Sequence, residues 1–493
     1  MNCRRQCSLL LTSRSAVIKV IVYAAVIVIF MELLSSVLTE KNNVLRSVDK
    51  LDSNKQLAPL VSLVDRVSNS NLVLPGGAAD DNNKVTAAGP IKKNVDPAVP
   101  ERKLKFSPFC PKLFANDKSA IEAAHKYMAA NPRTHLTPAN YSAMAKECGK
   151  FIHDRGYITS PLSQEEADFP IAFGIVIFKD IEQVERLLRA IYQPQHLYCI
   201  HVDVKSPSDY YAAVKSIADC FPNVFMSSKR ESVRWGTWSV LQADLNCIED
   251  LYRHKQKWKY LINLTGQEMP MVSNRQLVRV LKAYNGANDI EGTFKRKNKE
   301  RTTFVYKNDQ KTKDLLSPPP YNITPMKGSL HIVASRGYID FILHSMIAKA
   351  FTEWLRDTGI PDETFFSTMN HNPHLGVPGS YKGEPETHPV NKPFMTRYKN
   401  WGIWPFDYGQ CYGKRVRLVC VNGIGDLWFL KPRKELFINK FHLDYQYLAL
   451  DCWEQLQYNR TVESSDPGFQ FDDSYYRGLS FVKDKVVNPA YTL

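Results

Sequence analysis

Beyond residue 170, short apolar runs of strand length alternate with segments whose apolar positions recur at helical spacing. The runs that indicate buried strands are Ile171–Phe178, Leu197–Val202, Asn223–Met226 and Lys259–Leu264. The segments with one apolar helical face are Ile181–Tyr192, Ser239–Arg253 and Ser273–Tyr284. Continuous apolar strands that alternate with helices are typical of a largely parallel sheet covered on both faces. The pattern therefore predicts an α/β domain.

A longer apolar segment lies near the start of the chain, at residues 16–38. A helix of this length, at roughly 1.5 Å per residue, spans the hydrocarbon core of a bilayer. Arg4, Arg5 and Arg14 precede the segment, and such charges keep a short tail in the cytosol. We expect a cytoplasmic tail at 1–15 and a transmembrane signal anchor at 16–38, in type II orientation. A cleaved signal peptide is the alternative, but no clear small-x-small cleavage site follows.

The composition changes in the next segment, residues 39–105. From Glu40 to Lys105 there is no Trp, Tyr, Phe or Cys, so this segment cannot bury enough surface to pack by itself. We expect a flexible stem there and a lumenal catalytic domain at 106–493, which begins with a helical run near Lys118–Lys146. The alternative for residues 44–67, where Val and Leu recur at helical spacing, is a short self-associating helix that would make the chain a homodimer.

Composition and net charge indicate which kinds of ligand or partner suit the chain. Apolar residues make up 44% of the chain, enough for a sizeable core, and the net charge is +14. The positive charge is spread along the chain, so we expect no nucleic-acid partner for a lumenal domain, and anionic ligands such as nucleotide diphosphates suit it better. The chain contains neither G-x-G-x-x-G nor G-x-x-x-x-G-K-[ST], so dinucleotide and Walker-type nucleotide sites are not indicated.

The ten cysteines divide between the two sides of the expected anchor. Cys3 and Cys7 precede it, where reduced thiols or palmitoylation are expected. The other eight would be lumenal, and an even number there suggests a disulfide framework, although eight cysteines allow 105 connectivities. No Cys/His cluster has zinc-site spacing. Sequons for N-glycosylation agree with a lumenal address and occur at Asn140, Asn263, Asn322 and Asn459.

The end of the second predicted strand carries a candidate binding residue. Asp203 directly follows Leu197–Val202, and ligands of open parallel sheets bind beyond the carboxyl ends of the strands. A carboxylate there could accept hydrogen bonds from a nucleoside. By itself, however, such an Asp is more often a turn or helix-cap residue.

Many sugar-nucleotide transferases hold a metal ion with Asp-x-Asp at this point, but this chain has no Asp-x-Asp. If the substrate is a sugar diphosphonucleoside, the charge of its leaving group needs fixed cations instead. The segments Gly413–Val419 and Phe437–Phe441 both offer them, and surface charge is the alternative interpretation.

A candidate general base lies in the second half of the chain. Asp362 and Glu363 follow Pro361 and precede an apolar run, where acids commonly cap a helix and interact with its dipole. A Glu directed into a cleft there could instead take the proton of an alcohol acceptor, which must be lost as the alcohol attacks.

Several motifs together resemble one enzyme family. They are IYQPQHLYCIHVDVKS, CFPNVF, WSVLQADLNCIEDLY with WKYLINLTGQEMP, PDE, VRLVCVNGIGDL and LFINKF. Their order and cysteine spacing resemble the core-2/I-branching β-1,6-N-acetylglucosaminyltransferases of the Golgi (glycosyltransferase family 14). The resemblance covers roughly Phe106 to Cys452.

The resemblance implies a GT-A-type, Rossmann-like fold and inverting transfer from a UDP-sugar without a divalent metal. It implies that Glu363 is the catalytic base. Arg417 and Lys440 would neutralise the diphosphate in place of a metal, and Asp203 would contact the uridine.

The resemblance also assigns an acceptor site and a disulfide pattern. Glu291, Lys299 and Arg301 match residues that contact a Galβ1,3GalNAc-type sugar, and Trp401 falls near the acceptor-site aromatics. The pairings that the resemblance implies are Cys110–Cys452, Cys148–Cys220, Cys199–Cys247 and Cys411–Cys420.

Three departures from the family pattern concern the site. Thr265 stands where core-2 members often have a free Cys, and Trp235 stands at a donor-pocket position that is commonly Tyr. The acceptor loop is one residue shorter between Lys299 and Arg301, and Thr293 replaces a second acid after Glu291.

Taken with the resemblance, the sequence predicts a membrane-bound Golgi glycosyltransferase that extends mucin-type O-glycans. The expected donor is UDP-GlcNAc and the expected linkage is β-1,6 to a core such as Galβ1,3GalNAc. Two alternatives stay open: another donor such as UDP-glucose, or a non-catalytic lumenal glycan-binding protein.

Overall fold

The computed structural model describes residues 99–100, 107–293, 295, 298–307, 309–402 and 410–490. The expected cytoplasmic tail and membrane anchor lie outside these residues, as does the expected stem apart from residues 99–100. Within the described part of the chain, no helix is both long and apolar enough to cross a membrane.

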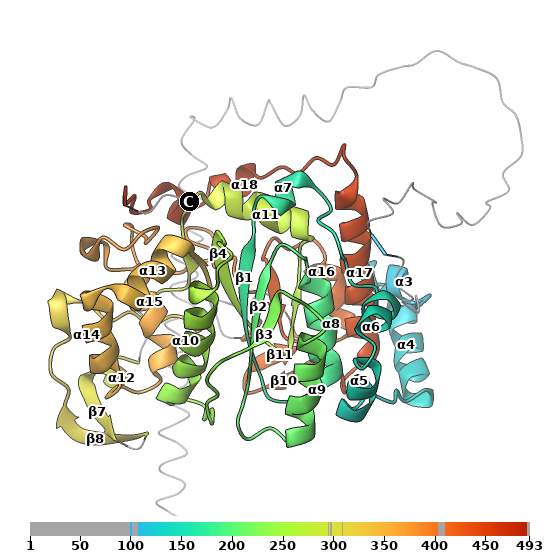
Figure 1. The fold of residues 1–493 in the computed structure, drawn as a ribbon, viewed down its shortest axis with the longest axis horizontal. Helices are drawn as coiled ribbons and strands as arrows, with labels where there is room; N and C mark the ends of the chain where they lie inside the picture. Colours follow the sequence, from blue (N-terminus) through green and yellow to red (C-terminus); the bar gives the residue numbers. More distant parts are fainter. Residues whose placement is uncertain are drawn as a thin grey trace, which may run out of the picture. The chain divides into compact units, whose positions relative to one another are not determined.

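A six-stranded sheet forms the centre of the domain, in the order β3-β2-β1-β4-β9-β6 (Figure 1). The four strands that the apolar runs predict are present and parallel to one another: β1 (Ile171–Ile177), β2 (Leu197–Val202), β3 (Val224–Met226) and β4 (Tyr260–Thr265). The antiparallel strand β9 (Ile332–Ser335) joins β4 to β6 (Asp289–Ile290). The predicted α/β class with a mostly parallel sheet is confirmed.

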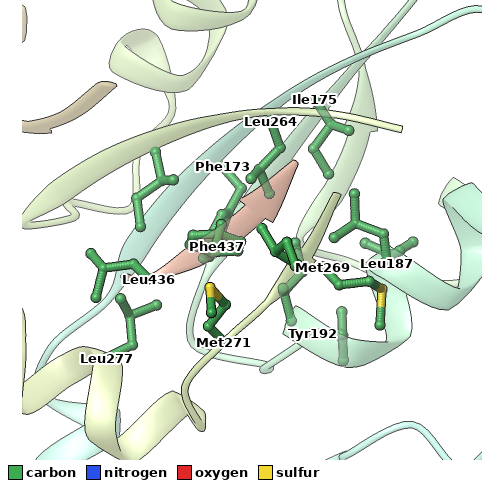
Figure 2. Packing of buried hydrophobic residues seen from close by; sticks show 14 of the residues in the cluster. Phe173, Ile175, Leu187, Tyr192, Leu264, Met269, Met271, Leu277, Leu436 and Phe437 are labelled. Carbon is green, nitrogen blue, oxygen red and sulfur yellow. The ribbon is translucent and has the colours of Figure 1, made fainter. Parts of the chain in front are cut away.

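Helices cover both faces of the sheet. Side chains of β1 alternate between the faces, since Phe173 and Ile175 belong to one core cluster and Ala172 to the other. The helices that pack on the first cluster are α8 (Ile181–Ile191), α9 (Ser208–Ala218), α11 (Asn274–Tyr284) and α17 (Tyr447–Ser465). Those on the second are α10 (Trp238–Arg253), α13 (Arg336–His344) and α14 (Met346–Leu355). Figure 2 shows the first cluster, where Phe437 lies beside Phe173 and Leu187 of α8 lies on the far side of Met269.

The predicted helical run near Lys118–Lys146 is two helices. α4 (Lys118–Ala130) and α5 (Pro138–Met144) are separated by a segment that contains Pro132. Thr137 begins α5 with a capping box, in which its hydroxyl accepts from the N–H of Asn140 at 3.3 Å. Proline and the capping box end one helix and start the next, which apolar spacing alone does not reveal.

The remaining elements are short. The other helices are α3 (Cys110–Phe114), α6 (Cys148–Arg155), α7 (Gln164–Ala167), α12 (Glu300–Thr303), α15 (Phe365–Asn370), α16 (Leu427–Leu430), α18 (Ser474–Arg477) and α19 (Ser480–Lys483), with 3-10 turns η1 (Pro320–Asn322), η2 (Pro361–Glu363), η3 (Pro373–Leu375) and η4 (Ile424–Asp426). Three antiparallel pairs complete the strands: β5 (Glu268–Pro270) with β12 (Phe437–Asn439), β7 (Phe304–Lys307) with β8 (Gln310–Leu315), and β10 (Lys414–Val416) with β11 (Val419–Val421).

The charged face of α8 is buried as well as its apolar face. Arg186 and Arg189 both pair with Glu454 of α17, at 2.8 and 2.5 Å. Glu185 accepts hydrogen bonds from Tyr157 at 3.1 Å and from Arg155 at 3.1 Å. Because these buried charges are matched, the face that looks solvent-exposed in the sequence holds α8 against its neighbours.

Three of the four expected disulfides are formed: Cys110–Cys452, Cys148–Cys220 and Cys411–Cys420. The first joins α3 to α17 across a sequence separation of 342 residues. The fourth expected pair is not bonded in the structure, where Cys199 and Cys247 are free. Their Sγ atoms lie 2.6 Å apart between β2 and α10, beyond the bonded distance of about 2.05 Å.

The four sequons differ in accessibility. Asn140, Asn322 and Asn459 are exposed. Asn263 is 2% exposed in β4, and its amide donates to Asp244 and to the carbonyl of Leu330 while its carbonyl accepts from Ile332. A glycan at Asn263 does not fit the folded protein, because its amide nitrogen is enclosed in the sheet.

Candidate active site

Asp203 lies where the strand pattern places it, at the carboxyl end of β2. Its main-chain N–H donates to the carbonyl of Ile177 at 2.9 Å, so it sits beside the end of β1. Its carboxylate accepts from the N–H of Lys205 at 2.8 Å and pairs with Lys205 Nζ at 3.0 Å. Arg230 fixes the same turn by donating to the carbonyls of Val202 and Asp203, each at 2.9 Å. Asp203 thus forms a turn at the carboxyl end of β2, as the turn interpretation of this residue predicts, and its contact with a nucleoside stays a prediction.

Trp235 lies on the loop between β3 and α10 and is 73% exposed. The next residue, Gly236, has φ +79°, a left-handed conformation that glycine adopts without strain. Thr237 then caps α10 by accepting from Ser239 N–H at 3.3 Å. A large aromatic side chain with this exposure is available to stack on a ligand.

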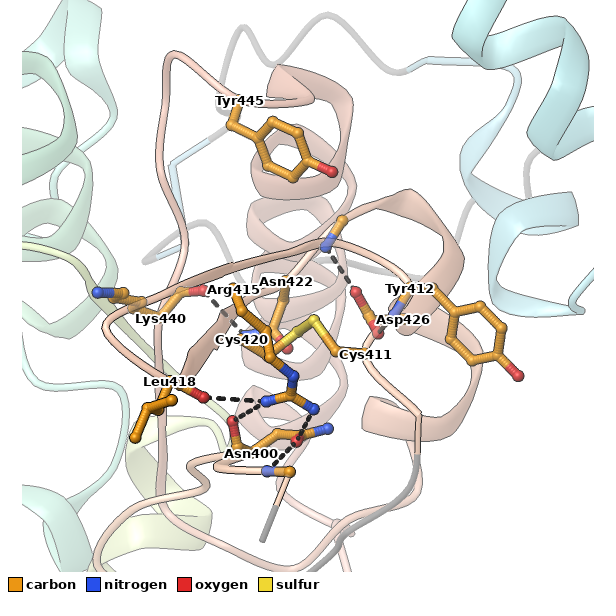
Figure 3. The surroundings of a disulfide bond; sticks show 12 residues. Asn400, Cys411, Tyr412, Arg415, Leu418, Cys420, Asn422, Asp426, Lys440 and Tyr445 are labelled. Carbon is orange, nitrogen blue, oxygen red and sulfur yellow. Dashed lines mark hydrogen bonds between the residues drawn. A yellow bond between two sulfur atoms is a disulfide. The ribbon is translucent and has the colours of Figure 1, made fainter. Parts of the chain in front are cut away.

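Arg417 lies at the tip of the β10–β11 hairpin. Arg417 and Leu418 have φ values of 50° and 70°, as a two-residue hairpin loop of the I′ class requires. The Cys411–Cys420 disulfide braces this hairpin, and Arg415 holds the tip by donating to the carbonyl of Leu418 at 3.0 Å (Figure 3). The side chain of Arg417 is exposed.

Lys440 is fixed to the same hairpin through its backbone. Asn422, directly after β11, donates its main-chain N–H and its Nδ2 to the carbonyl of Lys440, each at 2.9 Å (Figure 3). The structure therefore brings together the two cations that the sequence places 23 residues apart.

These cations act on one another electrostatically. Burial, with the positive charges of Arg417 and Lys179, lowers the pKa of Lys440. Burial and the charge of Lys440 lower the pKa of the neighbouring His442 to about 4. The sequence does not mark Lys179 as a candidate. Lys179 comes two residues after the end of β1, and Asp203 comes directly after the end of β2. A group of cations near the carboxyl ends of the strands suits a diphosphate.

Glu363 ends the 3-10 turn η2 and does not cap a helix. Neither η2 nor α15 has a side-chain cap hydrogen bond, so the capping interpretation is not supported. The Glu363 carboxylate is 27% exposed, and its Oε2 pairs with Arg301 Nη1 at 2.6 Å and with Lys327 Nζ at 3.4 Å. The preceding residue, Asp362, is buried, and burial together with the charge of Glu363 raises its pKa to about 7. Glu363 is therefore the accessible carboxylate of the pair.

Lys327 is a further site residue that no sequence motif marks. Its N–H donates to the carbonyl of Thr293 at 3.1 Å, and its own carbonyl accepts from Thr293 N–H at 2.7 Å. The next residue, Gly328, donates to the carbonyl of Glu363 at 2.7 Å, and a Cβ there would lie 2.2 Å from the Glu291 carbonyl. Glycine therefore permits the close approach that joins the acceptor loop to the turn of Glu363.

The four expected acceptor residues occupy two segments near this turn. Arg301 of α12 contacts Glu363 directly, and Lys299 is the N-cap residue of α12. Trp401 is partly exposed on the segment that also contains Lys399. Burial lowers the pKa of Lys399 to about 8 despite the opposing negative charges of Glu291, Glu268 and Glu363. Lys399 therefore lies close enough to Glu291 and Glu363 to interact with both charges, and Trp401 follows two residues later on the same segment.

Glu386, from another segment, contacts the acceptor loop at Thr293, the position where the family pattern has a second acid. Glu386 Oε1 accepts from the Thr293 hydroxyl at 2.6 Å, and its Oε2 accepts from the N–H of Lys295 at 3.2 Å. Gly292 and Thr387 fix this contact through hydrogen bonds of 2.7 and 3.0 Å. Thr293 replaces an acid of the family pattern, and the carboxylate of Glu386, 93 residues further along the chain, lies against it instead.

A fully buried carboxylate connects the segment of Lys399 with the segment of Lys440. Glu268 is 0% exposed and accepts from Arg397 Nε at 3.1 Å and from Asn439 Nδ2 at 2.8 Å. His331 Nε2 lies 2.8 Å from Glu268 Oε1, while His331 Nδ1 lies 2.9 Å from Lys399 Nζ. Arg397, together with His331, holds the pKa of Glu268 well below its usual range in spite of burial. Asn439 immediately precedes Lys440, so this network extends from Lys399 to the residue before Lys440.

The site combines the partly exposed carboxylate of Glu363, which is paired with Arg301 and Lys327, with a separate group of cations at the sheet edge. Among the residues that the structure describes, no three His, Cys, Asp or Glu side chains are grouped so as to hold a metal ion. Such an arrangement can take a proton from an alcohol at one place and stabilise a phosphate leaving group at another.

Comparison with known proteins identifies the family. Residues 171–427 match the family model described as Core-2/I-Branching enzyme. A human beta-1,3-galactosyl-O-glycosyl-glycoprotein beta-1,6-N-acetylglucosaminyltransferase is 38% identical over 369 residues, which are 72% of this chain and 86% of that protein. A Bos taurus protein of the same name is 40% identical over 348 residues, 68% of this chain and 80% of its own. A human protein of that name numbered 3 is 37% identical over 359 residues, 70% and 82% of the respective chains. The chain belongs to the Core-2/I-branching enzyme family.

Proposed function

We propose that this protein transfers N-acetylglucosamine from UDP-GlcNAc, in β-1,6 linkage, to a galactosylated O-glycan core such as Galβ1,3GalNAc. The names of its relatives specify a β-1,6-N-acetylglucosaminyltransferase acting on a β-1,3-galactosyl-O-glycosyl-glycoprotein. The observation that carries the proposal is the position of Glu363, an accessible carboxylate whose turn is bonded to the acceptor loop.

The proposed reaction is a single displacement on a GT-A-type domain. An acceptor hydroxyl oxygen attacks the anomeric carbon as Glu363 takes its proton, and the bond from that carbon to the diphosphate oxygen breaks. Attack opposite the leaving group inverts the anomeric configuration. UDP leaves with the bonding electrons, and Arg417 and Lys440 stabilise the charge that develops on it.

We propose that this stabilisation needs no divalent metal. The support is the cationic character of the sheet edge, where burial together with the positive charges of Arg417 and Lys179 lowers the pKa of Lys440. Asp203 and Trp235 would contact the uridine at the same edge, and Trp401 with Glu291, Lys299 and Arg301 would contact the acceptor.

The proposed location is the Golgi membrane, with the catalytic domain in the lumen. The support is the disulfides of the described domain, which persist in oxidising compartments, and the apolar segment 16–38 with its preceding arginines. A homodimer through the stem remains part of this proposal.

A donor-by-acceptor screen of the purified full-length chain, followed by linkage analysis of the product, tests the function. We expect GlcNAc on O6 of the acceptor's GalNAc, formed equally well with and without EDTA. Transfer of glucose instead would correct the donor and leave the reaction type. If the chain binds O-glycans but neither binds UDP nor consumes any UDP-sugar, the enzyme proposal is wrong and a glycan-binding role replaces it.

A further inference from the structure

His442 carries a buried ring nitrogen without a partner, beside the cations of the proposed diphosphate site. It follows Lys440 by two residues, and its side chain is 12% exposed. Its Nε2 is buried and has no hydrogen-bond partner among the residues that the structure describes. Its Nδ1 lies 3.9 Å from Asp444 Oδ1, which is beyond hydrogen-bond distance, and Asp444 itself is exposed. The imidazole is therefore not committed to a strong contact with the protein.

The backbone on both sides of His442 is fixed to α8. Gln183 of α8 is fully buried. Its Nε2 donates to the carbonyl of Phe441 at 2.8 Å, and its Oε1 accepts from the N–H of Leu443 at 3.0 Å. The N–H of Phe441 donates in turn to the carbonyl of Gln267 at 3.0 Å. The fold thus holds His442 in place through its neighbours and leaves the ring itself available for a ligand.

Cations from three segments act on His442. Burial, together with the positive charges of Lys440, Lys179 and Lys414, lowers the pKa of His442 to about 4, and Asp444 is the negative charge that opposes them. Lys414 and Lys440 form no ion pair with a carboxylate in the described part of the chain. Because positive charge outweighs negative charge around it, the imidazole is neutral near pH 7 in the free protein.

A bound nucleotide-sugar reverses this balance. The diphosphate of a UDP-sugar brings two negative charges and oxygens that only accept hydrogen bonds. An opposite charge within about 4–6 Å shifts a pKa by about 1–3 units, which would raise the pKa of His442 from about 4 to about 5–7. The added proton would come from solvent, and the imidazolium would then have a phosphate oxygen as the partner that its ring lacks.

We propose that His442 is a further cationic group of the donor site, which takes up one proton from solvent as the UDP-sugar binds and returns it when UDP leaves. This inference rests on the proposed function and adds a proton-linked step to donor binding. Since the bound state holds a proton that the free state lacks, donor affinity increases as the pH falls. The imidazolium also adds to the positive charge that Arg417 and Lys440 offer to the departing diphosphate.

Calorimetric titration of the full-length protein with UDP-GlcNAc tests the proton uptake. UDP-GlcNAc is used in place of UDP because the terminal phosphate of UDP itself titrates at about pH 6, whereas both phosphates of the nucleotide-sugar are esterified. Titrations at pH 6 in buffers of different ionisation enthalpy give the number of protons bound. We expect net uptake, and an affinity that rises by up to about tenfold per pH unit between pH 7 and pH 5.

His442→Gln should lose this proton uptake and the accompanying pH dependence of affinity. His153→Gln is the matched control, since His153 also neighbours an aspartate, with Nδ1 3.2 Å from Asp154 Oδ1, but is exposed on α6. Thermal melting identifies a variant that fails to fold. Deuterium exchange at the histidine C2 position, read by mass spectrometry, follows His442 in the wild type, where its pKa should rise when UDP-GlcNAc binds.

The outcomes separate the two proposals. Binding of UDP-GlcNAc without proton uptake, or with an uptake that His442→Gln retains, overturns the role of His442 and leaves the proposed function intact. The same holds if C2 exchange shows an unchanged pKa for His442 in the bound wild type. If the protein binds no UDP-sugar at all, the proposed function itself fails.

Discussion

The buried carboxylate of Glu268 accepts a hydrogen bond from Asn439 Nδ2 at 2.8 Å, and Asn439 is the residue directly before Lys440. The two residues also face each other in the β5–β12 pair, so backbone and side chain fix the same register. Glu268 touches neither expected substrate site, yet its partners Arg397 and Asn439 belong to the segments that carry Trp401 and Lys440. We infer that Glu268 is a positioning residue for both sites.

Glu268→Gln should therefore destabilise the domain and weaken UDP binding. Removing one partner of a buried ion pair typically costs about 3–5 kcal/mol, because Arg397 is left buried without its counter-charge. The folded-state pKa of Glu268 is lowered, so its stabilisation is complete above the unfolded value of about 4.3 and is lost as the pH falls below it. Urea unfolding should therefore show that the difference in free energy of unfolding between wild type and Glu268→Gln is smaller at pH 3 than at pH 7. Glu300→Gln, at an exposed ion pair with Lys311, should change stability by less than about 1 kcal/mol at either pH.

The sequence predicts those strands and helices whose apolar residues recur with a regular spacing. Four parallel strands and the helices between them are visible in the apolar runs, and Asp203 is found because it ends one of those strands. The charged face of α8 is not predicted, because Glu454 comes from 265 residues away and periodicity carries no information about it. The helix break before Thr137 is missed for a related reason, since apolar spacing does not register a capping box.

The candidate site shows the same division. Motif resemblance names Glu363, Arg417 and Lys440, and the structure shows the turn or strand end that holds each one. Lys327 and Lys399 lie in segments with neither motif nor period, so their contacts with Glu363 and His331 exist only in three dimensions. The sequence does not predict Glu386, because this acid contacts the acceptor loop from a distant segment of the chain.

Glu363→Gln should reduce kcat by about 10²–10⁴-fold, because the amide cannot take the acceptor's proton. UDP binding should change little, since the expected UDP contacts lie on other segments. Steady-state kinetics together with UDP titration measure the two effects separately. Glu353→Gln, at an exposed pair with Arg356, is the matched control and should keep wild-type kcat. Substantial kcat in the Glu363→Gln variant would remove this residue from the role of base.

Arg417→Met and Lys440→Met should each weaken UDP binding by about tenfold or more, since each removes a cation from the proposed diphosphate site. The effect should appear with and without EDTA, as measured by calorimetric titration of UDP. Lys349→Met on the exposed surface of α14 is the control for loss of a positive charge. If EDTA abolishes UDP binding by the wild type and Mn²⁺ restores it, metal-independent binding is contradicted.

Cys199 and Cys247 should become linked when the protein matures in an oxidising compartment. Their Sγ atoms are already adjacent at 2.6 Å, and little side-chain movement separates them from a bond. Peptide mapping without reductant should then recover a Cys199–Cys247 peptide beside the three disulfides of the structure. Alkylation of both thiols in denaturant, with no prior reduction, would show that the pair stays reduced as the structure has it.

Lys399→Met should change the pH dependence of stability in a defined direction. Burial lowers the pKa of Lys399 from 10.5 to about 8, so between these values the unfolded chain binds a proton that the folded protein does not. Wild-type stability therefore rises with pH in this window, by up to about 1.4 kcal/mol per pH unit, and the variant lacks this term. Urea unfolding at pH 7, 8.5 and 10 should show wild type gaining on Lys399→Met as the pH increases. The same series with Lys349→Met should run parallel to wild type, and a parallel course for Lys399→Met would mean that the ammonium of Lys399 is not held in a buried site.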